Sequence, residues 1–102
     1  MGQTVAMSLK EKFLRDGAVV LRGVVTPDEI EKLTRGIDAV LERPSARAKV
    51  ASTPDDPGFF IEDFSTWREH KEFKEFVLGT KLSKVAAELT GSSTIRMYHD
   101  HV

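Results

Sequence analysis

The sequence reads TPDEIEKLTRGIDAVLE over residues 26–42, and this stretch predicts a long amphipathic helix. Thr26 can cap the helix through its side-chain oxygen, and Pro27 has a backbone angle suited to the first helical position. The two acids that follow place negative charge at the positive end of the helix dipole. Apolar residues then recur at helical spacing: Ile30, Leu33, Ile37, Val40 and Leu41. We therefore expect a helix over 27–42 with one buried stripe, in which Gly36 marks a close packing contact.

Upstream of this helix the sequence predicts a shorter helix and a strand. Ser8 lies three residues before Glu11, the spacing of a reciprocal helix cap, and we expect a helix over 9–15. Residues 18–22, Ala-Val-Val-Leu-Arg, are mostly apolar and β-branched with a glycine on each side, which is typical of a strand. Because the apolar residues do not alternate with polar ones, we expect both faces of this strand to be covered.

After the long helix the pattern breaks into a proline-rich loop of about 15 residues over 43–58, and loops of this length are often functional. A short strand is expected at 59–61 and a second strand at 94–100. Helices are expected over 65–78, as one helix or two short ones, and over 80–90. The expected core is Leu21, Ile30, Leu33, Ile37, Val40, Phe73, Phe76, Val85 and Leu89.

The composition is that of one small domain covering residues 1–102, of which 1–7 are expected to be flexible. Hydrophobic residues make up 40% of the chain and charged residues 30%, so a core can form. Fifteen Lys and Arg nearly balance sixteen Asp and Glu, which argues against nucleic acid or a membrane surface as a partner. The chain has no cysteine, and its longest apolar run, 18–21, is far too short to span a membrane. We expect a cytoplasmic protein.

The main cluster of metal-ligand types is His99-Asp100-His101. In a strand both histidines would point to one face, and His70 or Asp63 could supply a third ligand. The spacing nevertheless differs from the His-x-Asp/Glu pair of non-haem iron sites. The alternative is that these side chains are solvated or hydrogen-bonded, and we assign no metal ligand.

Other polar residues also have simpler explanations. Glu69 and His70 could act in acid–base chemistry, but an exposed helix rich in Lys and Glu explains them as well. The acidic residues between 55 and 63 could form a paired-carboxylate site, whereas their proline-rich surroundings favour turns and helix caps. The sequence holds neither a glycine-rich phosphate loop nor a serine nucleophile motif. No catalytic residue is assigned.

The order of the features along the chain carries more information than any one of them. Residues 13–30, FLRDGAVVLRGVVTPDEI, join an Asp-Gly turn to an apolar strand and a capped helix. The proline-broken loop and Trp67 come next, followed by a helix that ends in AELTGS at 87–92. Residues 95–101, IRMYHDH, form a strand with a Tyr-His-Asp-His ending. In this order the features resemble the opening of the phytanoyl-CoA dioxygenase family, and the resemblance spans residues 9–102.

The resemblance implies an α+β fold, with an N-terminal helical support layer and the first strands of a double-stranded β-helix (jelly roll) whose barrel is incomplete in this chain. Members of the family are oxygenases that use Fe(II) and 2-oxoglutarate to hydroxylate a small organic substrate. Their iron ligands, a His-x-Asp pair and a distant His, lie after the Tyr-His-Asp-His strand, as does the basic residue for 2-oxoglutarate. The likeness therefore implies a chain that is inactive alone and binds neither cofactor, with Tyr98 and Asp100 near the substrate pocket and the iron triad beyond Val102.

Two other interpretations remain open from the sequence. The chain could be a non-catalytic module that binds a protein partner by adding strands at an exposed edge. It could also be an unrelated small α+β domain. Whether the chain is part of an oxygenase or a binding module, the strand over 94–101 has an edge without a partner. We expect self-association through this edge.

Overall fold

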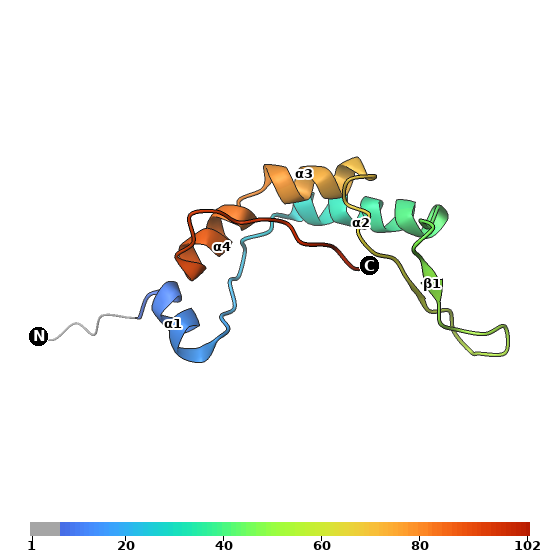
Figure 1. The fold of residues 1–102 in the computed structure, drawn as a ribbon, viewed down its shortest axis with the longest axis horizontal. Helices are drawn as coiled ribbons and strands as arrows, with labels where there is room; N and C mark the ends of the chain where they lie inside the picture. The colour runs from blue at the N-terminus through green and yellow to red at the C-terminus, as the bar shows by residue number, and fades with distance from the viewer. Residues whose placement is uncertain (1–6) are drawn as a thin grey trace, which may run out of the picture. The chain divides into compact units, whose positions relative to one another are not determined.

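The computed structural model describes residues 7–102, and in them it holds four helices and one two-stranded antiparallel sheet. The helices are α1 (Leu9–Asp16), α2 (Pro27–Glu42), α3 (Lys71–Gly79) and α4 (Leu82–Thr90), and the strands are β1 (Lys49–Val50) and β2 (Ile61–Glu62) (Figure 1). Residues 1–7 were predicted to be flexible, and six of them, 1–6, lie outside the described residues. No helix in the described part is long and apolar enough to cross a lipid bilayer.

Contacts divide the chain into two units. Among the described residues, the first unit joins residues 7–25 to 81–96, and in it α1 packs against α4. The predicted start and end of α1 and the predicted end of α4 are confirmed: the N–H of Glu11 donates to the Ser8 hydroxyl (3.1 Å), and Gly17 and Gly91 take left-handed conformations at the two C-termini. α4 begins at Leu82 and not at residue 80. Neither helix has a fully buried side chain, so this unit has an open, thin core.

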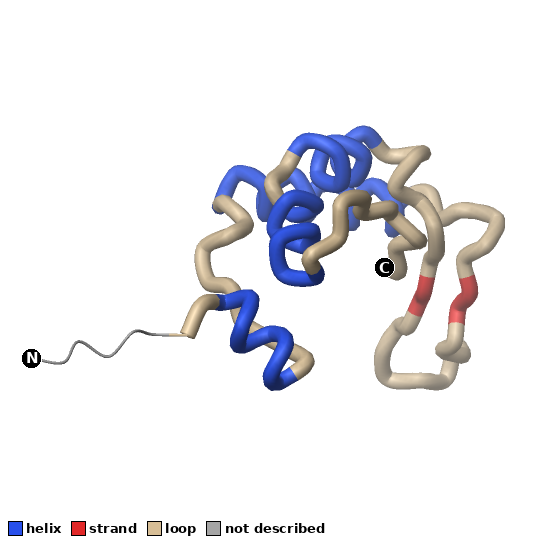
Figure 2. Tube along the Cα trace, turned by 60° about the vertical axis from the view of Figure 1, so that its left-hand side comes forward, coloured by secondary structure: helices blue, strands red, loops and turns tan. Residues whose placement is uncertain are grey.

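The second unit joins residues 26–80 to 97–102, and its helices α2 and α3 lie side by side (Figures 1 and 2). The predicted helix over 27–42 is confirmed at both ends. Its capping box is complete, because the N–H of Thr26 donates to the Glu29 carboxylate (2.8 Å) and the N–H of Glu29 donates to the Thr26 hydroxyl (3.2 Å). These bonds satisfy two of the otherwise unpaired donors at the start of the helix.

Gly36 lies at a close contact between α2 and α3. A Cβ placed on Gly36 would lie 2.6 Å from Cε1 of Phe73 and 3.1 Å from Cβ of Glu72, so the helices meet where α2 has no side chain. Of the predicted core, only Val40 (2% exposed) and Phe73 (7%) are buried. The predicted buried stripe of α2 was wrong for three residues, since 53% of Ile30, 40% of Ile37 and 50% of Leu41 remain exposed. The other members are half-buried: Leu21, Leu33, Phe76, Val85 and Leu89.

The sheet is a small hairpin, with Lys49 opposite Glu62 and Val50 opposite Ile61 (Figure 2). The N–H of Ala51 extends the ladder by donating to the carbonyl of Phe60 (2.9 Å). β1 therefore lies within the segment that the sequence predicts as loop. That prediction missed it because the strand is only two residues long and its side chains are exposed.

The predicted α+β fold with the start of a jelly roll is wrong, because the described chain is mostly helical and its only sheet has two short strands. Residues 18–22 do not form a strand, and residues 94–100 do not form one either. A strand needs a neighbour to accept and donate its backbone hydrogen bonds. Ala18, Val19 and Val20 make no such bond with any residue of 7–102, nor do 94–98. Residues 18–20 and 94–98 therefore have suitable residue types and lack a backbone hydrogen-bond partner among residues 7–102.

Candidate functional site

The end of the chain docks against the segment that follows β2, within the second unit. Val102 and Asp63 exchange both backbone hydrogen bonds (2.9 Å each), and the N–H of Ser65 donates to the carbonyl of Asp100 (3.0 Å). Phe64 and His101 stand opposite each other as an isolated antiparallel bridge. Since β1 occupies the other edge of β2, this arrangement begins a third strand of the small sheet.

The carboxylate of Asp100 binds the turn that replaces the start of the predicted helix over 65–78. It accepts hydrogen bonds from the backbone N–H of Thr66 (3.1 Å), the hydroxyl of Thr66 (3.0 Å) and the N–H of Trp67 (2.8 Å). The preceding Ser65 has a left-handed backbone (φ +53°), and Thr66 is fully buried. The prediction was wrong over 65–70 because a carboxylate distant in sequence binds N–H groups there, and α3 begins only at Lys71.

Asp63 is a second carboxylate of this cluster, and only 1% of it is exposed. It accepts hydrogen bonds from the N–H (2.7 Å) and the hydroxyl of Ser45 and from the N–H of Phe64 (2.8 Å). Burial by itself raises the pKa of Asp63, but the hydrogen bonds from Ser45 and Phe64 outweigh it and hold the pKa below its ordinary value. The buried carboxylate is therefore ionised at neutral pH and ties the start of the loop to the end of β2.

Arg47 covers the same segment from the outside. Its guanidinium donates to the carbonyls of Phe64 (2.8 Å) and Ser65 (3.2 Å) and to the carboxylate of Glu69 (2.8 Å). The hydrogen bond to Glu69 raises the pKa of Arg47. Together with the bonds of the two aspartates, these contacts fix residues 63–67 by polar groups from three separate parts of the chain.

The two residues predicted to lie near a substrate pocket have different surroundings. Both carboxylate oxygens of Asp100 accept hydrogen bonds from the turn, so this side chain holds structure in place. Tyr98 is 91% exposed, and its ring contacts only the ring of His99 (4.8 Å between centroids) among the described aromatic contacts. Tyr98 is thus the one of the pair that is available to a ligand.

The candidate metal ligands do not come together. The described residues contain no group of three His, Cys, Asp or Glu side chains placed to hold a metal ion. His101 lies against the ring of Phe64 (4.5 Å) with its Nε2 3.2 Å from the Glu62 carboxylate, and His70 packs edge-on against Phe73. These residues by themselves do not fit an iron centre.

One acidic residue of the proline-rich loop, Asp56, serves a turn, as the alternative explanation predicted. The carboxylate of Asp56 accepts the N–H of Thr53 (2.6 Å), and the N–H of Asp56 returns to the carbonyl of Thr53 (3.0 Å). Sequence reasoning missed Ser45, Arg47 and Thr66, because their partners lie 17 to 34 residues away. Nothing in the local spacing marks these three residues.

No model of a known protein family matches this chain, and no solved structure matches it.

Proposed function

We propose that this chain is the N-terminal portion of a phytanoyl-CoA dioxygenase-like oxygenase that depends on Fe(II) and 2-oxoglutarate, and that it is inactive alone. Support comes from the ordered sequence features over residues 9–102. In this proposal the rest of the enzyme supplies the iron ligands and the 2-oxoglutarate site. The complete enzyme hydroxylates a small organic substrate in the cytoplasm, and it needs neither nucleic acid nor a membrane as a partner.

The observation that carries the proposal is the docked segment at 98–102, where the resemblance is strongest. Asp100 and Val102 direct their backbone groups toward residues 63–65. In an extended segment the backbone groups of alternate residues point to opposite sides, so those of His99 and His101 face outward. They bond to no residue of 7–102, which leaves an edge at which further polypeptide can continue the sheet.

In this proposal the residues of this chain position neighbouring segments and orient the substrate. Asp100 acts as a positioning residue, because its carboxylate fixes the turn on which the segment rests. Tyr98, which is exposed beside this anchor, is the candidate for contact with substrate. Bound elsewhere in the complete enzyme, Fe(II) and 2-oxoglutarate supply the oxidation of an unactivated C–H bond.

The test compares this chain with a version extended through the downstream coding sequence. With Fe(II), ascorbate and 2-oxoglutarate, the extended protein should form succinate and the 102-residue chain should not. Downstream sequence that lacks a His-x-Asp pair and a distal His, or enzyme-like turnover by the short chain, would overturn the proposal. In the extended protein, Tyr98→Phe should change KM more than kcat.

The second candidate, a non-catalytic module that binds a protein partner, is favoured by the same open edge at 99–101. It includes self-association, in which one copy pairs with the edge of another. The binding-module candidate predicts that an added peptide, pairing as a strand, protects the amides of His99 and His101 from hydrogen exchange. This protection should occur without any other portion of an oxygenase. Succinate formation by the extended protein would favour the oxygenase instead.

A further inference from the structure

The side chain of His101 joins the docked segment at 98–102 to β2. Its Nε2 lies 3.2 Å from the carboxylate of Glu62, and its ring lies against the ring of Phe64 with 4.5 Å between centroids. His101 stands directly opposite Phe64 in the antiparallel bridge, so Glu62, two residues before Phe64, is its diagonal neighbour on the same face. The ion pair between β2 and the docked segment therefore depends on the charge of one imidazole.

Histidine is the side chain whose charge ordinarily changes between pH 5 and 8. When protonated, an imidazole forms a charge-assisted contact with a carboxylate, which is stronger than the contact of a neutral ring. In this pair 50% of the His101 side chain and 32% of the Glu62 side chain are exposed, so protons reach the pair and water weakens it. The contact is therefore modest in strength and sensitive to pH.

The other charged groups beside the docked segment do not replace this contact. Three of them are held by the hydrogen bonds described above: Asp63, Asp100 and Arg47. Lys49 stands opposite Glu62 in the hairpin, but no ion pair joins Lys49 to any residue of 7–102. Because lysine ordinarily keeps its charge across this pH range, Lys49 gives Glu62 a constant positive neighbour while His101 varies.

We propose that His101 acts as a pH-sensitive switch, whose protonation between pH 8 and pH 5.5 strengthens the docking of residues 98–102 on residues 62–65. The backbone bonds of Asp63, Ser65 and Val102 are available in both protonation states, so the neutral imidazole loosens the segment without releasing it. The switch sets how firmly the chain holds the open edge at 99–101. It does not rest on the proposed oxygenase function.

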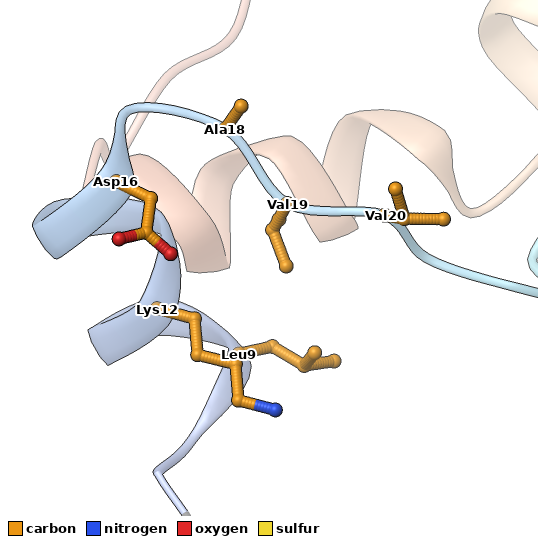
Figure 3. Close-up of a pocket in the computed structure, with 6 residues that line it drawn as sticks. All are labelled: Leu9, Lys12, Asp16, Ala18, Val19 and Val20. Atoms are coloured by element: carbon orange, nitrogen blue, oxygen red, sulfur yellow. The ribbon is translucent and has the colours of Figure 1, made fainter.

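The first unit supplies an internal control, because all three histidines of the chain lie in the second unit. In the extended segment at 18–22 of the first unit, Val20 is 71% exposed, which corrects the expectation that both faces of this segment are covered. A groove of about 400 Å³ beside it is lined by Leu9, Lys12, Asp16 and residues 18–20 (Figure 3). Arg15 holds the pKa of Asp16 below its ordinary value. Since lysine and aspartate ordinarily keep their charges between pH 5.5 and 8, this unit should not respond.

The test is amide hydrogen exchange at pH 5.5 and pH 8.0, expressed as protection factors so that the pH dependence of the intrinsic exchange rate cancels. In the wild type, the amides that donate the docked bonds should be about two- to fivefold better protected at pH 5.5, the size expected of an exposed ion pair: Asp63, Ser65 and Val102. The amide of Gly17, which donates to the carbonyl of Phe13 in the first unit, should be equally protected at both pH values.

Two variants remove the switch from either side. His101→Gln keeps a polar side chain without a titratable charge, and Glu62→Gln keeps the imidazole but neutralises its partner, so both should abolish the pH dependence. His99→Gln is the matched control, because the ring of His99 contacts the ring of Tyr98 and forms no ion pair with residues 7–102. It should keep the wild-type dependence.

Three results would overturn the proposal. The first is equal protection of the docked amides at both pH values in the wild type. The second is a pH dependence that survives in His101→Gln or in Glu62→Gln. The third is a pH dependence that disappears in His99→Gln, which would assign the effect to the neighbouring histidine.

Discussion

Two extended segments of this chain differ both in residue type and in whether their backbone is held in place. Residues 18–21 in the first unit carry a continuous apolar run, yet their amides find no partner among residues 7–102. Residues 98–102 in the second unit carry mostly polar side chains, yet three backbone bonds and the carboxylate of Asp100 hold them in place. Hydrogen-bonding partners, and not β-propensity, decide which segment is held in this molecule.

The same contrast separates the two units as wholes. The buried side chains of the described part, two apolar and two polar, all belong to the second unit: Val40, Phe73, Asp63 and Thr66. Every buried side-chain nitrogen or oxygen in the described part has a hydrogen-bond partner. Substitutions in the second unit should therefore cost far more stability than substitutions in the first.

The largest effect is expected for Asp100→Ala, which makes the second unit resemble the first by freeing its extended segment. Three donors of Thr66 and Trp67 lose a charged acceptor, and the free energy of unfolding should fall by about 3 kcal/mol in urea titrations. Hydrogen exchange at residues 63–67 should rise. Asp55→Ala in the exposed loop is the matched control, and an equal loss in both variants would contradict the assigned role of Asp100.

Asp63→Asn should cost about 2 kcal/mol at neutral pH, because an amide cannot accept all the donors of Ser45 and Phe64. The folded pKa of Asp63 lies below its ordinary value of 3.8, so its ionised form stabilises the fold above that pH. This stability is lost as pH falls through 3.8 toward the folded pKa. The free energy of unfolding of the wild type should thus approach that of the variant as the pH falls through the acid range. A difference in free energy that does not change with pH would refute the assignment.

Gly36→Ala tests the helix contact of the second unit. The new methyl group would overlap the buried ring of Phe73, and we expect a net loss of about 1–2 kcal/mol despite the better helix propensity of alanine. Gly79→Ala in α3 is the control, since nothing lies within 4 Å of its added Cβ. The control should melt at or above the wild-type melting temperature. An equal fall in melting temperature in both variants would mean that the loss does not come from the contact between Gly36 and Phe73.

The smallest effect is expected in the first unit, for Leu14→Ala. Leu14 is 65% exposed on α1, so its truncation should change the free energy of unfolding by less than about 0.5 kcal/mol. Calorimetry of this variant beside Asp100→Ala would measure the contrast between the units directly. A loss above 1 kcal/mol would mean that the first unit has a tighter core than its exposed side chains indicate.

Local signals predicted α1, α2 and the end of α4 well, whereas α3 begins six residues later than predicted. The capping box at Thr26 and the glycines at 17 and 91 each act within four residues, so the sequence alone locates those helix ends. The sheet could not be predicted in the same way, because pairing depends on distant segments. Apolar residues at 18–22 predicted a strand without revealing whether a neighbour exists.

The candidate site was only partly predictable for the same reason. The resemblance of residues 95–101 to a family motif predicted that Asp100 lies near a pocket. The spacing of the sequence could not predict its contacts with Thr66 and Trp67. Ser45 and Arg47 sit in a proline-rich loop that offers no periodic signal. Their roles depend on Asp63 and Phe64, which only the folded chain brings within reach.

The dependence of the Thr66 turn on Asp100 sets an order of events during protein synthesis. The two residues are 34 positions apart, so the turn has no acceptor for its amides until the ribosome has added that many more residues. At ordinary translation rates this takes about 2–7 seconds, whereas α2 has all of its own capping groups as soon as it is made. A nascent chain should therefore present a finished helix and an exposed, protease-sensitive segment at 63–67 until residues 100–102 have been synthesised.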